Sequence, residues 1–128
     1  MIKYDLHSHT KYSDGSLSAQ ALIALAIDRG ISHLAITDHD TVQEHLQLTE
    51  NNNSYATEKI NIIKGIELSS QWNNMGVHIV GLNIDIHSTA ITAAVKHQTQ
   101  LRIERVKTIA KKLLQRGFPD ITQGAMIL

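Results

Sequence analysis

The chain has 128 residues, 42% of them hydrophobic, and twelve basic and twelve acidic side chains that cancel, as suits one globular domain or part of one. It contains no cysteine, which excludes disulfides and thiolate metal sites, and no apolar run approaches the roughly 20 residues of a membrane span. We expect a cytoplasmic protein with no membrane partner, because the N-terminus also lacks the apolar core of a signal peptide.

Strands and helices alternate in the predicted order of elements. The clearest helix starts after Ser18, a favourable N-cap, and stops before Gly30, with apolar residues at helical spacing between them. In chain order we expect a strand over 2–8, a helix over 19–29, a strand over 33–37, a weaker helix from 41 to about 59 that is broken or frayed at 51–54, extended pieces over 60–63 and 65–68, a turn or hairpin loop over 72–76, a strand over 77–82, and a helical stretch, with or without a break, over 88–116.

This alternation predicts an α/β fold with a largely parallel sheet or barrel and helices outside it. Barrel enzymes carry their chemistry at the C-terminal ends of the strands. Polar residues fall at those ends in this sequence: His7 and His9 end the first strand, Asp38 and His39 the second, and Glu67 the third, whereas His78 lies within the fourth.

The last predicted helix differs in charge from the rest of the chain. Residues 1–95 carry five Lys or Arg against ten Asp or Glu, whereas residues 96–116 carry seven Lys or Arg against Glu104 alone. The acidic part suits cations, and guanidinium groups on the basic segment suit a phosphate. On charge alone, a solvated helix face is the more ordinary explanation of the basic segment.

The candidate metal ligands begin with two histidines at alternate positions. Side chains alternate along a strand, so His7 and His9 point to the same face if residues 2–8 are extended. Their nitrogens, together with nearby carboxylates, suit Zn, Mn or Fe, and Glu67 has two oxygens with which to bridge two ions. A cluster that could hold two or three ions comprises His7, His9, Asp14, His39, Glu67 and His78.

Each of these residues also has an ordinary structural explanation when it is taken alone. Glu67 is the hardest to explain in that way, because carboxylates that follow apolar residues are rarely buried unless they are paired or bind a metal. The alternatives are a hydrogen-bonded pair for His7 and His9, a turn for Asp14, a strand-end turn or helix cap for residues 38–40, a core histidine for His78, and packing for Trp72; we interpret His33, His45, His87 and His97 as structural or surface residues.

Four motifs in this order resemble the PHP family, the polymerase and histidinol phosphatase superfamily of metal-dependent phosphoesterases. The resemblance covers essentially the whole chain. It implies the front part of a distorted (β/α)7 barrel over residues 1–97, and the start of a helical insertion that binds substrate over residues 98–128. The motifs are His7-Ser8-His9-Thr10 with Ser13-Asp14-Gly15, Thr37-Asp38-His39-Asp40-Thr41, Gly65-Ile66-Glu67, and His78-Ile79-Val80-Gly81.

A narrower resemblance is to bacterial PHP enzymes that act on nucleoside 3′,5′-bisphosphates and on the 5′ ends of short RNAs. It is carried by residues 67–72 and 78–82, and by Gln98 with Arg102 and Arg105. It implies two or three divalent ions, with manganese preferred over zinc or iron, and a nucleotide or short RNA as the substrate. The resemblance implies one metal position at His7, His9 and Glu67, a second shared by Glu67 and His78, and a third at Asp14 and His39. It also implies catalytic roles for Asp38 and Glu67, with Asp38 orienting its neighbours. Arg102 and Arg105 are implied to contact phosphate.

The implied reaction is hydrolysis of a terminal 5′-phosphate by water that the metals activate. A histidinol-phosphate-type phosphatase and a non-catalytic metal-stabilised module are the alternatives. The family completes its site with a further histidine and an Asp-x-His pair, but no histidine follows His97 here. We therefore expect the front part of a longer protein, which alone binds metal weakly, turns over little or nothing, and self-associates through exposed sheet edges.

Overall fold

The computed structural model describes residues 1–50, 56–57 and 59–125. The predicted break at 51–54 lies outside these residues. The chain divides into two compact units, residues 1–95 and residues 96–128.

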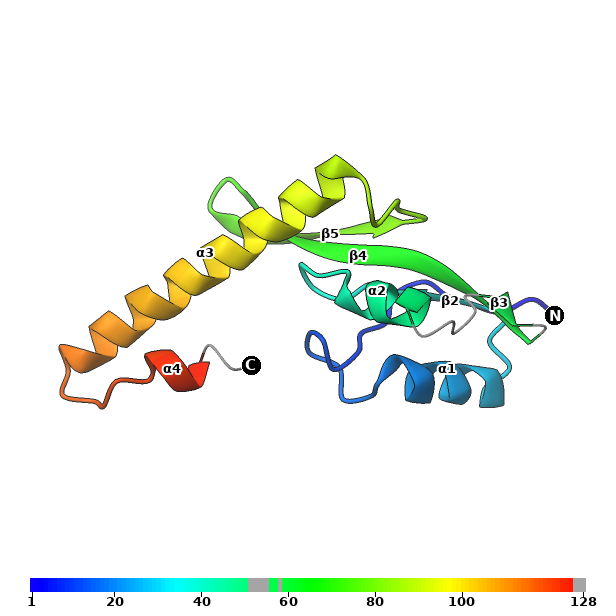
Figure 1. The fold of residues 1–128 in the computed structure, drawn as a ribbon, viewed down its shortest axis with the longest axis horizontal. Coiled ribbons are helices and arrows are strands. Elements are labelled where there is room, and N and C mark those ends of the chain that lie inside the picture. Colours follow the sequence, from blue (N-terminus) through cyan, green and yellow to red (C-terminus); the bar gives the residue numbers. More distant parts are fainter. Residues whose placement is uncertain (51–55, 58, 126–128) are drawn as a thin grey trace. The chain divides into compact units, whose positions relative to one another are not determined.

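The first unit contains a mixed five-stranded sheet (Figure 1). Strands β1 (Tyr4–Asp5), β2 (His33–Ile36) and β4 (Ile60–Trp72) are parallel neighbours. Strands β3 (Ala56–Thr57) and β5 (Met75–Leu82) both pair antiparallel with β4. The α/β class is confirmed, but the sheet is not largely parallel as predicted, because a tight hairpin follows β4 directly.

The first strand is shorter than the predicted 2–8. Strand pairing with β2 covers only Tyr4 and Asp5. Beyond it, the Thr37 N–H donates to the Ser8 carbonyl at 2.8 Å and the Ser8 hydroxyl donates to the Ala35 carbonyl at 2.6 Å. His7 and His9 therefore follow β1 rather than end it. Further along, residues 10–15 form a loop closed by bonds from Ser13 N and Gly15 N to Thr10 O.

Helix α1 (Ala19–Asp28) begins and ends at the signals that predict it. The Ser18 hydroxyl accepts a hydrogen bond from the Ala21 N–H at 3.3 Å, and Gly30 adopts a φ of 71° just past the end. A left-handed residue after a helix favours glycine, since glycine has no Cβ to clash.

Helix α2 (Gln43–Glu50) is much shorter than the predicted 41–59. Part of the predicted helix is β3, whose residues Ala56 and Thr57 pair with Asn61 and Ile60 of β4. Pairing with a sheet neighbour outweighs the weak helical preference of this polar segment, as tertiary context often does.

Strands β4 and β5 form a hairpin around a two-residue turn. Asn73 and Asn74 have φ values of 46° and 64°, and Trp72 pairs with Met75 on either side of them. Positive φ at both central residues is typical of a type I′ turn, which matches the twist of hairpin strands. Strand β4 thus runs unbroken to Trp72, so Glu67 lies within it and not at its end as predicted.

Two hydrophobic clusters lie in the first unit. The larger joins the inner face of α1 to β2 and β4, with Leu48 of α2, and the smaller gathers around Ile66. Helices α1 and α2 lie on the same side of the sheet in Figure 1. The buried members of the larger cluster are Ala19, Ala26, Leu34, Ile36, Leu48, Ile60 and Ile62.

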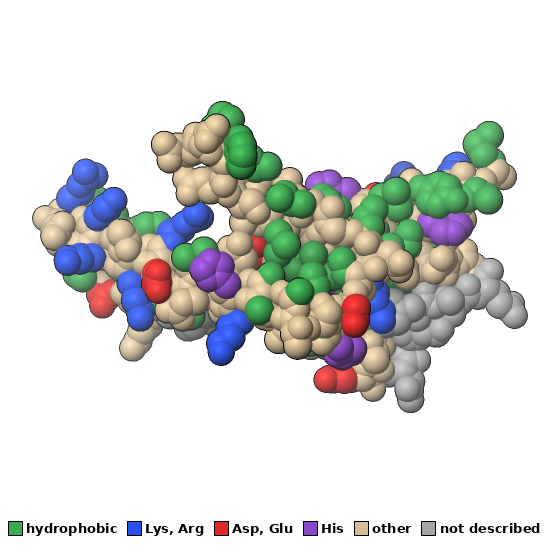
Figure 2. Space-filling model, turned by 90° about the horizontal axis from the view of Figure 1, so that it is seen from above, with side chains coloured by type: hydrophobic (Ala, Val, Ile, Leu, Met, Phe, Trp, Pro, Cys, Tyr) green, Lys and Arg blue, Asp and Glu red, His purple; other side chains and the backbone are tan. Residues whose placement is uncertain are grey.

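The second unit consists mainly of helix. Helix α3 (Thr89–Leu114), which starts in the first unit, runs without a break and is followed by Gly117 at a φ of 83° and by the short α4 (Thr122–Ala125). Figure 2 shows Lys and Arg side chains gathered over the second unit with few acidic groups among them. Within the described residues, none of the helices combines the length and hydrophobicity that a membrane crossing needs.

Candidate metal centre

All six predicted metal ligands meet in the first unit. They come from the segment after β1, the loop before α1, the end of β2, and the two strands of the hairpin. Ligand atoms within each of three overlapping groups lie within 4.8 Å of one another. The groups are His7, His9 and Glu67; His9, Asp14 and His39; and His39, Glu67 and His78.

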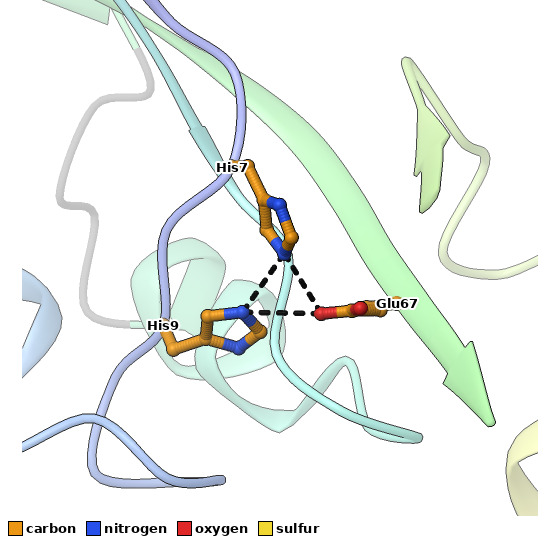
Figure 3. Close-up of side chains that lie close together, drawn as sticks. All are labelled: His7, His9 and Glu67. Atoms are coloured by element: carbon orange, nitrogen blue, oxygen red, sulfur yellow. Dashed lines mark hydrogen bonds and ion pairs between the residues drawn. The ribbon is translucent and has the colours of Figure 1, made fainter. Parts of the chain in front are cut away.

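Glu67 stands at the centre of this cluster. Its Oε2 lies 2.8 Å from His7 Nε2 and 3.1 Å from His9 Nε2, an arrangement that Figure 3 shows. Its Oε1 lies 3.0 Å from Nδ1 of His78, and His39 Nδ1 is 3.6 Å from Oε2. One carboxylate oxygen thus faces the first group and the other faces the hairpin, as a bridging ligand requires.

The surroundings of Glu67 keep its carboxylate ionised. Burial of a side chain that is 5% exposed would by itself raise the pKa of Glu67. The hydrogen bond with His7 and the charges of His39, His7 and His9 together outweigh burial and bring the pKa below its ordinary value. An anionic Glu67 is the form that a cation binds.

The backbone around Glu67 is fixed from the neighbouring strand. His39 and Glu67 form an isolated parallel bridge beyond the end of β2. The Glu67 N–H donates to the Asp38 carbonyl at 3.1 Å, and the Asp40 N–H donates to the Glu67 carbonyl at 3.0 Å. His39 and Glu67 are therefore held side by side by main-chain bonds.

Asp38 lies outside the three ligand groups and organises the loop that follows His9. Its buried carboxylate accepts hydrogen bonds from the Thr10 N–H at 2.7 Å, the Thr10 hydroxyl at 2.7 Å and the Ser13 hydroxyl at 2.6 Å. Because the Ser13 hydroxyl gives its proton to Asp38, its oxygen can accept from Nδ1 of His9, 3.3 Å away. A neutral His9 that donates from Nδ1 in this way presents the lone pair of Nε2 to the centre, which is the form that a cation binds.

The nitrogen Nδ1 of His39 supports a metal-binding interpretation. It is buried, and among the described residues it has no hydrogen-bond partner. Buried polar atoms are almost always satisfied, so an orphaned nitrogen beside a carboxylate calls for an explanation. A cation between His39 and Glu67 would supply the missing interaction, and four imidazoles with two carboxylates suit Mn, Zn or Fe.

Apart from Asp38, sequence reasoning did not single out the residues that support the ligands. The hydroxyls of Thr10 and Ser13 belong to the first motif, but only their contacts with Asp38 reveal what they do. Glu44, on α2, is buried and lies 3.4 Å from the Thr10 hydroxyl; burial and then the charge of Asp38 raise its pKa. A polar residue in a polar helix gives no sequence signal of such burial.

Arg102 and Arg105 lie in the second unit. Both are exposed on α3 and are three residues apart, so they are neighbours on one helix face. Their contact with a phosphate stays a prediction.

The fold and the cluster together define a mixed α/β protein with a set of potential metal ligands at its sheet. The chain matches the PHP domain family over residues 5–122, and it belongs to that family.

Particular relatives can be named within this family. The 5′-3′ exoribonuclease Rnm of Escherichia coli is 41% identical over 125 residues, which cover 98% of this chain and 42% of that protein. The 3′,5′-nucleoside bisphosphate phosphatase of Chromobacterium violaceum is 36% identical over 126 residues, or 98% of this chain and 43% of that protein. The chain thus spans less than half the length of these relatives.

A solved structure has the same fold. An amidohydrolase from Chromobacterium violaceum, solved with bound sulfate and no metal, superposes with a TM-score of 0.78 at 35% identity. The similarity covers 97% of this chain and 43% of that chain.

Proposed function

We propose that the protein is a divalent-metal-dependent phosphoesterase that removes the 5′-phosphate of nucleoside 3′,5′-bisphosphates or of short RNAs in the cytoplasm. The observation that carries the proposal is the position of Glu67, a buried anion whose two oxygens face four imidazoles. The names of the relatives, an exoribonuclease and a bisphosphate phosphatase, support the substrate class.

We assign the three groups of residues to two or three metal positions. His7, His9 and Glu67 would hold one ion, Glu67 and His78 would share in a second, and Asp14 with His39 would hold a third. Manganese is our first choice, with zinc and iron as alternatives, because imidazole and carboxylate ligands accept all three.

When bound, divalent ions at such a site activate water and neutralise the charge on phosphate oxygens. The chain's own groups fix the geometry. Ionised Glu67 holds two ligand groups together, and Asp38 fixes the loop from which His9 and Asp14 project. Arg102 and Arg105 are proposed to bind the second phosphate of the substrate through bidentate hydrogen bonds.

Metal analysis tests the centre first. The whole protein in which this sequence occurs would be loaded with manganese, zinc or iron and dialysed, beside a His7→Ala/His9→Ala variant and a control His87→Ala/His97→Ala variant. His87 and His97 are exposed and belong to none of the three groups, so the control removes as many imidazoles. We expect metal on the wild type and the control and little on the first variant. Equal loading of all three proteins, or of none, would contradict the assignment.

A substrate panel then tests the reaction with the whole protein in which this sequence occurs. Phosphate release would be compared for a nucleoside 3′,5′-bisphosphate, a 5′-phosphorylated short RNA and histidinol phosphate. We expect release from the first two. Release from histidinol phosphate alone would indicate a histidinol-phosphate-type phosphatase, and metal binding without any hydrolysis would indicate a non-catalytic module.

A further inference from the structure

The residue after His39 makes two bonds to β4, at the carbonyl of Glu67 and at the N–H two residues further on. The Asp40 N–H donates to the carbonyl of Glu67 at 3.0 Å, and Oδ1 of Asp40 accepts from the N–H of Ser69 at 2.7 Å. Asp40 is itself 8% exposed and belongs to none of the three ligand groups. Asp40 therefore holds the backbone of β4 directly after Glu67, and the bond from the Glu67 N–H to the Asp38 carbonyl holds it on the other side.

The side-chain bond replaces a main-chain bond that the sheet would otherwise make. In a parallel ladder that continues the bridge between His39 and Glu67, the N–H of Ser69 would bind the backbone carbonyl of Asp40. The chain turns away toward α2 at this point, and the carboxylate of Asp40 takes the place of that carbonyl. The ladder beside Glu67 is thus completed although β2 has ended.

The backbone of Asp40 shows that this arrangement has a conformational cost. Its φ is 56°, in the left-handed region that glycine adopts freely and that other residues seldom adopt. Asparagine and aspartate tolerate this region better than most residues, but glycine would avoid the strain. A strained residue beside a site is a reason to look for a function of its side chain.

We propose that Asp40 is a positioning residue that sets Glu67 and His39 in register for metal binding by supplying the acceptor for Ser69. The inference rests on the proposed metal centre. It predicts that metal affinity depends on the hydrogen-bond acceptor at position 40, and not on the negative charge or the positive φ of that residue. Loss of a group that supports metal ligands typically costs about 10- to 100-fold in metal affinity.

Three variants separate these properties. Asp40→Asn keeps an oxygen acceptor and tolerates a positive φ but removes the charge. Asp40→Gly adopts a positive φ without strain but removes the acceptor. Asp40→Ala removes the acceptor and also tolerates the positive φ poorly. Asp85→Gly is the matched control, because the Asp85 carboxylate also accepts a backbone N–H, that of His87 at 3.0 Å, but lies outside the cluster.

The measurements, on the whole protein in which this sequence occurs, are manganese affinity by titration calorimetry and thermal melting by circular dichroism. We expect wild-type affinity for Asp40→Asn and Asp85→Gly, and affinity lowered about 10- to 100-fold for Asp40→Gly and Asp40→Ala. The melting temperature of metal-free Asp40→Gly should stay near that of the wild type, because relief of the strained φ offsets the lost bond.

Each outcome supports or overturns the positioning role of Asp40. Wild-type affinity in a folded Asp40→Gly protein would overturn the positioning role alone, whereas no metal on the wild type would overturn the metal centre with it. If Asp40→Gly does not fold, Asp40→Asn decides: wild-type affinity supports the acceptor role, and a tenfold loss in a normally folded protein overturns it.

Discussion

At the scale of single residues, the site depends on one carboxylate that contacts several imidazoles at once. Glu67 approaches His7, His9 and His78 within 3.1 Å, and its two oxygens face different ligand groups. Substitution of this residue should therefore affect more than one ion position. Each surrounding histidine belongs to fewer ligand contacts than Glu67, so single histidine variants should lower metal affinity less.

Glu67→Gln tests this directly. Glutamine has nearly the same shape and can still hydrogen-bond to the histidines, but it offers no charge to bridge two cations. We expect metal affinity to fall by more than about 100-fold, beyond the usual cost of losing a supporting group. The free energy of unfolding without metal should change by only about 1 kcal/mol. Metal analysis and denaturant unfolding measure the two effects; a variant that loads metal and turns over normally would disprove the bridging role.

Gly15→Ala tests the loop that carries Asp14. A Cβ at Gly15 would collide with the carbonyl group of His9, which is backbone and cannot rotate away. We expect the variant to lose about 1–3 kcal/mol of stability, as overpacked positions do, and to bind metal more weakly. Gly76→Ala is the matched control because its Cβ would meet no atom within 4 Å. Equal melting temperatures for both variants in circular dichroism would show that the loop can adapt.

At the scale of elements, sequence predicted best what is decided locally. Helix α1 follows from its cap at Ser18 and its stop at Gly30, which act within one turn. Strand β3 could not be predicted, since its pairing with Asn61 and Ile60 depends on a partner that no local pattern names. The length of β4 was missed for the same reason: its second half is defined by pairing with β5.

The candidate ligands were predictable because their spacing and order form motifs, although two strands ended elsewhere than expected. His7 and His9 still reach Glu67, since the chain stays extended after β1. The supporting contacts were not predictable. The bonds from Thr10 and Ser13 to Asp38 join residues 25 or more positions apart, and side-chain direction decides them.

Helix α3 carries the substrate prediction at this scale. Replacing Arg102 and Arg105 with alanine, singly, should raise the KM for a nucleoside 3′,5′-bisphosphate about tenfold, the value of one charge-assisted hydrogen bond. A 5′-monophosphate, which lacks the second phosphate, should change less. Lys107→Ala is a control, because the helical repeat puts it on a different face. Steady-state kinetics of the whole protein give the comparison, and equal effects on both substrates would remove the arginines from recognition.

At the scale of the whole molecule, one buried histidine links pH to stability. His45 is 1% exposed, and its Nε2 lies 3.0 Å from the Ile36 carbonyl oxygen and 3.1 Å from that of Gly65. Burial lowers its pKa below the ordinary value of 6.5. The folded state therefore takes up the proton less readily than the unfolded state, and stability is complete above pH 6.5 and is lost as the pH falls below it.

We expect the melting temperature of the metal-free protein to fall as the pH is lowered from 7.5 to 5.5. One proton lowers the free energy of unfolding by at most about 1.4 kcal/mol per pH unit. The His45→Gln variant should have a lower melting temperature at pH 7.5, and that temperature should change less with pH than the wild type's. His87→Gln, at an exposed position, should keep the slope of the wild type. Calorimetric melts across this range measure both slopes; identical slopes for wild type and His45→Gln would assign the pH dependence to other groups.

The hairpin has a consequence for the order in which the site is assembled during folding. Glu67 and His78 lie on adjacent strands joined by a two-residue turn, whereas His7 and Glu67 are 60 positions apart. Closing a short loop costs less entropy than closing a long one, so contacts within the hairpin can form before distant parts of the chain meet. We therefore expect the centre to grow outward from the hairpin, with the N-terminal histidines arriving last.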